Sequence, residues 1–140
     1  MGYNVEATAV EVTIPAAKLP EALAALKALN QRDDLKTGGS STGEKWFAWM
    51  DPDYDKNLHT VEDIMQEVGF QDNEMTAEGF RLGWYDSKTG GEEHFLRALA
   101  PFVDEGSYVE WEGEDRAKWR NVFRGGEMLT QTGTVTYEED

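Results

Sequence analysis

The spacing of apolar residues changes along this chain between two periods, and this pattern constrains the fold more than any other feature of the sequence. Apolar residues at every second position are typical of strands, and apolar residues at every third or fourth position are typical of amphipathic helices. In chain order the pattern predicts three strand–helix pairs followed by three strands. This order is typical of an α+β domain, in which helices pack on one mixed, mainly antiparallel sheet.

Six segments fit the period of a strand, and three fit the period of a helix. The predicted strands are Val5 to Ile14, Lys45 to Met50, Phe80 to Trp84, Ser107 to Glu112, Lys118 to Arg124 and Met128 to Tyr137. The predicted helices are Pro20 to Asn30, Thr60 to Val68 and Glu92 to Val103, the last kinked or ended by Pro101. The last three strands follow one another closely, with a tight turn at Gly125-Gly126, which predicts a C-terminal three-strand meander.

Local signals refine these elements. In a regular strand, Val5 and Val10 would point to opposite faces, because an odd number of positions separates them. Since both are apolar, we expect a bulge near Thr8 that brings them to the same face. Thr60 followed by Asp63 fits a capping box at the start of the second helix.

Composition adds to the prediction for one strand and predicts two connecting segments. The segment Lys45 to Met50 is apolar at both parities, which predicts a strand covered on both faces. The segments Thr37 to Gly43 and Asp86 to Gly91 are rich in turn-forming residues, so we expect a flexible loop and a turn there.

The length of 140 residues predicts a single domain over residues 1–140 with one core. There is no cysteine, so neither disulfides nor thiolate zinc sites contribute. The start of the chain lacks the pattern of a secretion signal, and no apolar run is long enough to cross a bilayer, so we expect a cytoplasmic protein. The predicted core residues are Val10, Val12, Leu23, Leu26, Trp46, Ile64, Leu82, Phe95, Leu99, Val109 and Val122.

The charge is strongly negative and unevenly distributed. The chain has 28 acidic and 13 basic residues, a net charge of −15, and 22 of the acids lie in the ninety residues from Asp51 to Asp140. Such a surface disfavours contact with nucleic-acid phosphates and anionic membranes and favours a basic protein partner. The candidate partner-binding residues are Asp51, Asp53, Asp55, Glu110, Glu112, Glu114 and Asp115.

One acidic segment also resembles a calcium-binding loop. Asp51, Asp53, Asp55 and Glu62 occupy the first, third, fifth and twelfth places of that twelve-residue pattern. The sixth place turns sharply and is glycine in that pattern, but it is Lys56 here. A calcium site therefore stands beside the simpler alternative of a solvated acidic loop that leads into the second helix. No other cofactor is predicted.

Two other chemistries remain open. Glu110 and Glu112 share one face of a strand, and paired carboxylates about 5 to 9 Å apart serve glycoside hydrolysis. Carbohydrate binding would use tryptophan rings, although core packing is the plainer role for most of them. The five tryptophans are Trp46, Trp49, Trp84, Trp111 and Trp119. No nucleophile motif or phosphate-binding loop is present, which favours a non-enzymatic protein over an enzyme.

The C-terminal half carries a resemblance. The segment from Tyr85 to Gly126, with its strand ending in Gly113-Glu114-Asp115 followed by Trp119-Arg120, resembles small proteins of actinobacterial phages and mobile elements. More distantly, the chain is similar to the ferredoxin-like domain of the Api92 and YubB type. The resemblance implies a ferredoxin-like fold and a phage or mobile-element setting, and it implies no catalytic residues. Together with the charge, it favours an accessory protein that binds a basic host protein, such as a DNA-mimic-like inhibitor of a nucleic-acid-targeting defence system, in the host cytoplasm.

Overall fold

The computed structural model describes residues 2–133 and contains four α-helices and ten strands within them. The helices are α1 (Leu19–Ala28), α2 (Tyr54–Asn57), α3 (Val61–Val68) and α4 (Glu92–Leu99). The strands are β1 (Asn4–Glu11), β2 (Thr13–Pro15), β3 (Gly38–Gly39), β4 (Lys45–Trp46), β5 (Glu74–Thr76), β6 (Gly79–Arg81), β7 (Asp86–Lys88), β8 (Tyr108–Gly113), β9 (Lys118–Arg124) and β10 (Glu127–Thr132). The C-terminal part of the predicted strand Met128 to Tyr137 lies outside the described residues.

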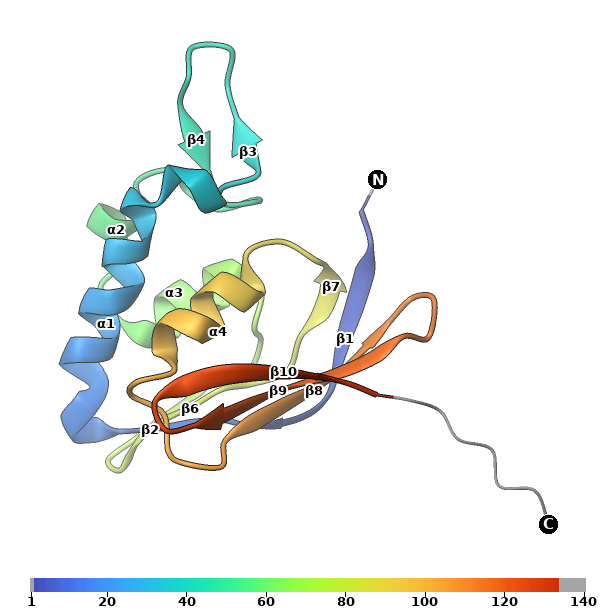
Figure 1. Cartoon of the computed structure of the whole chain (residues 1–140). Helices are drawn as coiled ribbons and strands as arrows, with labels where there is room; N and C mark the ends of the chain where they lie inside the picture. The colour runs from blue at the N-terminus through green and yellow to red at the C-terminus, as the bar shows by residue number, and fades with distance from the viewer. Residues whose placement is uncertain (1, 134–140) are drawn as a thin grey trace.

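The main sheet has five strands in the order β10-β9-β8-β1-β7, and every neighbouring pair is antiparallel. Strands β7 and β8 are joined by α4 and are separated in the sheet by β1, which is a split β-α-β arrangement of the ferredoxin-like kind. Helices α3 and α4 lie on one side of the sheet, and α1 packs against them (Figure 1). The prediction of an α+β fold with a C-terminal three-strand meander is confirmed.

The first predicted strand is divided between two sheets. The register of β1 against β8 shifts between Ala7 and Ala9, so the predicted bulge at Thr8 is confirmed. Side chains of a strand alternate between its two faces, and the extra residue of the bulge shifts this alternation by one position. The apolar side chains before the bulge, such as Val5, and after it, such as Val10, can therefore face the same side of the sheet. After Glu11 the chain leaves the main sheet, and β2 joins a second sheet in the order β2-β6-β5.

The prediction of a strand from Lys45 to Met50 is wrong beyond its first two residues. Only β4 is extended. It pairs in a hairpin with β3, and β3 lies inside the segment predicted to be a flexible loop. The chain then turns, since the Met50 N–H donates to the Phe47 carbonyl at 3.0 Å and Trp49 has a φ of 52°. Both Phe47 and Met50 therefore reach the core from a turn, and the apolar run reflects this burial and not a two-sided strand.

Three short polar elements were absent from the sequence-based predictions. Strand β7 lies within the predicted turn from Asp86 to Gly91, and β5 and α2 fall in segments that show no clear period. The predicted strand from Phe80 to Trp84 is shorter in the structure, where only β6 is extended.

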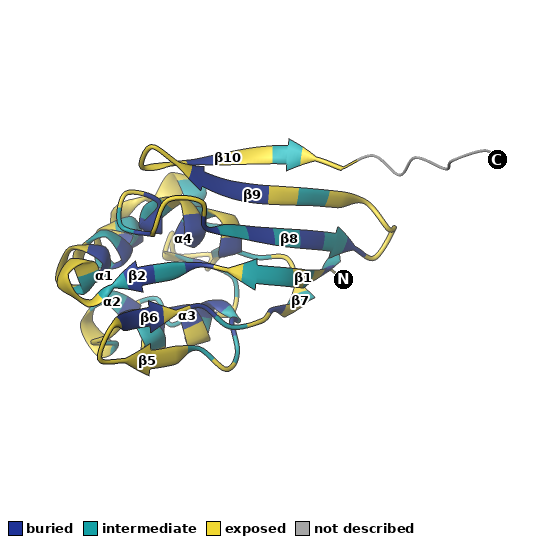
Figure 2. Cartoon of the chain, turned by 90° about the horizontal axis from the view of Figure 1, so that it is seen from below, coloured by how far each residue is buried: buried dark blue, intermediate teal, exposed yellow. Residues whose placement is uncertain are grey.

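The helices and the core agree with the predictions. The Thr60 hydroxyl oxygen accepts the Asp63 N–H at 3.0 Å, so the cap of α3 is confirmed. All eleven predicted core residues are buried or half-buried, and one contiguous core connects the sheets and helices into a single domain. Nine of the eleven belong to this core or pack against it, whereas Trp46 and Val122 lie outside it. Along β8, buried residues alternate with half-buried ones (Figure 2). Since successive side chains of a strand point to opposite faces, the half-buried ones face the side of the sheet away from the core. None of the described helices is long and apolar enough to cross a membrane.

Candidate protein-binding surface

The candidate partner-binding residues fall into two separate groups. Asp51, Asp53 and Asp55 lie in and before α2, which packs against α1. Glu110 and Glu112 lie on β8, and Glu114 and Asp115 lie in the turn after it. Helix α2 and strand β8 occupy different parts of the molecule in Figure 1, so the fold does not unite the two groups into one surface.

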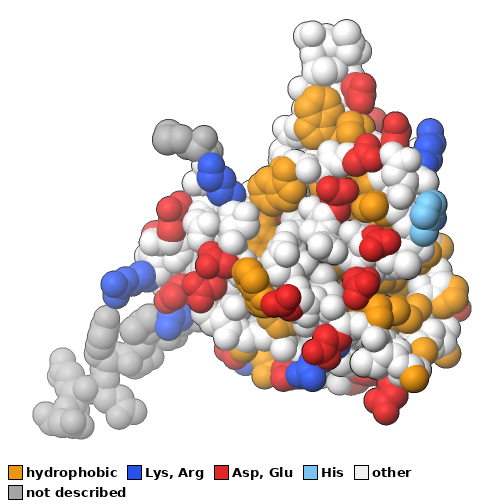
Figure 3. All heavy atoms as spheres, turned by 180° about the vertical axis from the view of Figure 1, so that it is seen from behind, with side chains coloured by type: hydrophobic (Ala, Val, Ile, Leu, Met, Phe, Trp, Pro, Cys, Tyr) orange, Lys and Arg blue, Asp and Glu red, His pale blue; other side chains and the backbone are white. Residues whose placement is uncertain are grey.

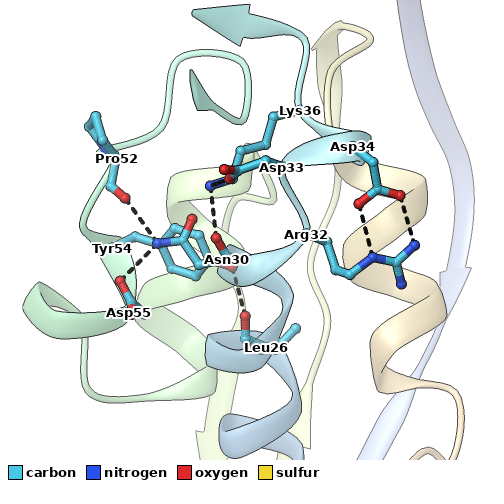
Figure 4. Close-up of polar contacts among 9 residues, drawn as sticks. All are labelled: Leu26, Asn30, Arg32, Asp33, Asp34, Lys36, Pro52, Tyr54 and Asp55. Atoms are coloured by element: carbon cyan, nitrogen blue, oxygen red, sulfur yellow. Dashed lines mark hydrogen bonds and ion pairs between the residues drawn. The ribbon is translucent and has the colours of Figure 1, made fainter. Parts of the chain in front are cut away.

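The first group is partly used to attach α2 to α1 (Figure 4). The Asn30 Nδ2 donates to the Pro52 carbonyl at 2.9 Å and to Asp55 Oδ1 at 2.8 Å. The Tyr54 hydroxyl donates to the Leu26 carbonyl at 2.7 Å, and burial raises the pKa of this hydroxyl. The Asp55 carboxylate therefore has a structural partner, which sequence reasoning gave no means of foreseeing.

Lys36 neutralises part of the negative charge next to this contact. Its Nζ donates to the Asn30 carbonyl and to Asp33 Oδ1, both at 2.7 Å, and its side chain is only 4% exposed. The Asn30 Oδ1 is buried without a hydrogen-bond partner among the described residues. The junction between α1 and α2 is thus a closed polar contact and not an open acidic surface.

The calcium-loop residues do not form a cation site in the described part of the chain. No group of three or more His, Asp or Glu side chains is placed there to hold a metal ion. Asp51 instead bonds within the loop and to α2, since its carboxylate accepts from the Asp53 N–H at 2.9 Å and from Asn57 Nδ2 at 2.7 Å. These two donors hold the pKa of Asp51 below its usual range. Glu62 lies on α3.

We expect millimolar calcium to leave the melting temperature unchanged. A ligand that binds only the native state stabilises it by RT ln(1 + [L]/Kd), so a site with a Kd of about 10 μM would gain about 2.7 kcal/mol in 1 mM calcium. Thermal melts with calcium and with chelator check this. A rise with calcium that Asp53→Asn removes would show that the loop rearranges into a cation site.

The second group lies on the open face of the main sheet. Glu110 is directly opposite Arg120, and Glu112 is directly opposite Lys118. The Lys118 Nζ lies 3.9 Å from Glu112 Oε1, so these two side chains form an ion pair across the strands. The Arg120 guanidinium instead donates to Gln131 Oε1, at 2.7 and 3.2 Å. Both carboxylates thus lie across from basic residues of β9.

A row of three carboxylates crosses the same face of the sheet. Glu6 on β1 is directly opposite Glu112 on one side and Asp86 on the other. Like charges directly opposite one another destabilise a sheet. We call Asp86, Glu6 and Glu112 the carboxylate row. Sequence reasoning selected only Glu112, because the pairing of β1 with β7 is not visible in the sequence.

The turn after β8 extends this acidic region. Glu114 Oε1 accepts the Asn4 N–H at 3.1 Å. The Asp115 carboxylate accepts from the Tyr3 hydroxyl and the Ala117 N–H, and these bonds lower the pKa of Asp115. An open depression of about 480 Å³ lies at this end of the sheet. Its lining residues are Asn4, Glu6, Glu112, Gly113, Glu114 and Arg116.

Two tryptophans are largely exposed. Trp49 is 46% exposed and Trp84 is 48% exposed, whereas Trp111 is buried. The Trp49 Nε1 donates to the Val68 carbonyl at 3.0 Å, and the Trp84 Nε1 donates to Asp72 Oδ2 at 2.7 Å. Figure 3 shows one face of the molecule on which apolar and acidic side chains are mixed, with few basic ones among them.

Comparisons of the chain with protein-family models, curated proteins and solved structures give no significant match. We therefore infer a function from the chemistry of this surface.

Proposed function

We propose that this chain is a non-enzymatic binding protein, and that its carboxylate row binds a basic segment of another protein. The observation that carries the proposal is the alignment of Asp86, Glu6 and Glu112 on three neighbouring strands. Like charges in this register oppose folding, and the ion pair of Lys118 with Glu112 offsets only one end of the row, so the stability of the sheet gives no reason for the two like-charge contacts of Glu6. A cationic partner relieves the repulsion, and binding therefore accounts for the row.

The charge of the whole chain supports the same class of partner. A net charge of −15 repels nucleic acids and anionic membranes and steers basic proteins toward the acidic face. Given the resemblance of the C-terminal half, the partner would be a host nucleic-acid-binding protein in the cytoplasm. The chain would then act as a phage or mobile-element accessory protein, for example as a DNA-mimic-like inhibitor of a defence nuclease. The alternative is that the acids serve solubility alone.

We expect Glu6→Lys to weaken binding to a basic probe and at the same time to stabilise the fold. A lysine between Asp86 and Glu112 replaces two like-charge contacts, which destabilise the sheet, with two opposite-charge contacts. Each opposite-charge pair contributes about 0.2–1 kcal/mol to the stability of a sheet. The probe is a labelled twelve-residue peptide of alternating arginine and glycine. Its dissociation constant should rise several-fold, mainly through slower association, and wild-type binding should weaken as salt is raised from ~50 to ~500 mM.

The matched control is Glu127→Lys, which changes the net charge equally. Glu127 is opposite Arg124 at the far end of the sheet, so this variant should lose stability slightly and keep its affinity. The proposal fails if both variants weaken binding to the same extent, because the charge would then act only in a non-specific way. It also fails if the peptide does not bind the wild-type protein at low salt.

A further inference from the structure

A shallow depression of about 420 Å³ lies beside Trp49, on the side of the molecule that carries both exposed tryptophans. Its lining residues are Trp49, Leu58, Asp63, Gln66, Glu67 and Gln71. It thus combines an indole ring, two carboxylates and two carboxamides, and no basic residue is among these lining residues.

The Trp49 ring is held in place before any partner binds. The Nε1–H bond to the Val68 carbonyl fixes the edge of the ring at the end of α3. Gly90 lies so close that an added Cβ would approach the ring to 2.8 Å. The φ of 52° at Trp49 is a rare conformation for a bulky residue, and such strain is typical of positions where function fixes a side chain. An exposed ring held in this way loses little entropy when a ligand stacks on it.

Of the two carboxylates of the depression, Asp63 lies in the favourable first turn of α3, and Glu67 is placed unfavourably for this helix. Asp63 and Glu67 are four residues apart on α3, and like charges at this spacing destabilise a helix. Glu67 also lies in the last turn of α3, where the helix dipole disfavours negative charge. A cation between these carboxylates and the indole removes both penalties.

We propose that this depression binds an arginine side chain of the basic partner. This inference rests on the proposed function and specifies one contact that the partner makes. A guanidinium is planar, stacks on an indole face and bonds to carboxylates in a bidentate manner, so it fits these groups better than the compact lysine ammonium.

The depression and the carboxylate row lie along one strip of surface. The backbone of Gln71 bonds to that of Trp84 in both directions, at 2.8 and 2.9 Å. Trp84 and Asp86 are both exposed, on either side of the buried Tyr85. The strip therefore runs from Trp49 through Gln71 and Trp84 to the row, and one extended basic segment would contact both ends. Trp84, whose indole is oriented by Asp72, provides a second exposed ring along it.

The test uses three twelve-residue peptides in which glycine alternates with arginine, lysine or citrulline. The variants are Trp49→Leu and Glu67→Gln, with Glu93→Gln on α4 as the control for charge and Trp49→Phe to retain an aromatic ring. We expect about tenfold weaker binding of the arginine peptide for Trp49→Leu and for Glu67→Gln, and a smaller loss for the lysine peptide. Trp49→Phe should show an intermediate loss, because it keeps an aromatic ring but lacks the Nε1–H bond to the Val68 carbonyl. Glu93→Gln should bind like the wild type. The citrulline peptide should not bind, because it has no charge.

The outcomes separate this inference from the proposed function. If Trp49→Leu and Glu67→Gln bind like the wild type while Glu6→Lys binds weakly, the depression is not the arginine site and the proposed function stands. If no basic peptide binds the wild type, both proposals fail. If a neutral oligosaccharide binds and Trp49→Leu abolishes that binding, the depression is a sugar site. Thermal melts of each variant show whether a lost affinity reflects a lost fold.

Discussion

Replacement of Phe95 by alanine is expected to lower the free energy of unfolding by about 3–5 kcal/mol. Phe95 is fully buried, and its ring centroid lies 5.0 Å from that of Phe47 and 5.6 Å from that of Tyr54. The three rings come from α4, from the turn after β4 and from α2. Because these segments are separately attached to the fold, they cannot close together over the cavity that the alanine leaves.

Urea unfolding of wild type and variant measures this loss. The control is Phe102→Ala, since Phe102 is only half-buried at the edge of the core and should lose less. A loss below about 1 kcal/mol for Phe95→Ala would mean that the aromatic cluster does not hold the helices to the β3–β4 hairpin.

Gly79→Ala is expected to cost at least about 3 kcal/mol or to prevent folding, because a buried clash adds to backbone strain. Gly79 has a φ of 145°, and an added Cβ would lie 2.0 Å from the Ile14 carbonyl oxygen. That oxygen belongs to β2, which pairs with β6, so relief of the clash requires the second sheet to open.

Gly106→Ala separates the clash from the strain. Gly106 also has a positive φ, of 85°, but an added Cβ meets nothing within 4 Å. Its loss should be limited to the backbone term of about 1–2 kcal/mol. Equal losses for the two variants in the same denaturation experiment would contradict the close contact between β2 and β6.

The parts of the fold that the sequence predicted are those set by nearby residues. The Thr60 cap, the helical stripes of α3 and α4 and the turn at Gly125-Gly126 each need only local contacts. Strand β7 was missed because its side chains are polar and its partner, β1, lies about eighty residues away in the sequence. Such pairing depends on the whole fold and leaves no local period.

The candidate surface was predicted only in part, for the same reason. Glu112 was selected from its own strand, but the carboxylate row becomes visible only when the register places Glu6 and Asp86 beside it. Asp51 and Asp55 were expected to contact a partner, and the structure engages both in hydrogen bonds within the chain. The exposed Trp49 was assigned to a strand because it lies in a short run that is apolar at both parities, as is typical of a strand covered on both faces.

The measurement that tests the central claim most directly is a titration of ¹⁵N-labelled protein with the arginine–glycine peptide, followed by N–H chemical shifts. We predict that the indole N–H signals of Trp49 and Trp84 and the backbone N–H signals of Glu6 and Asp86 shift together, with one dissociation constant that weakens as salt rises. The Trp111 indole, buried and bonded to Asn121 Oδ1 at 2.7 Å, should not shift. Shifts that spread without saturation over other acidic residues, such as Glu21 on α1, would contradict a specific binding strip.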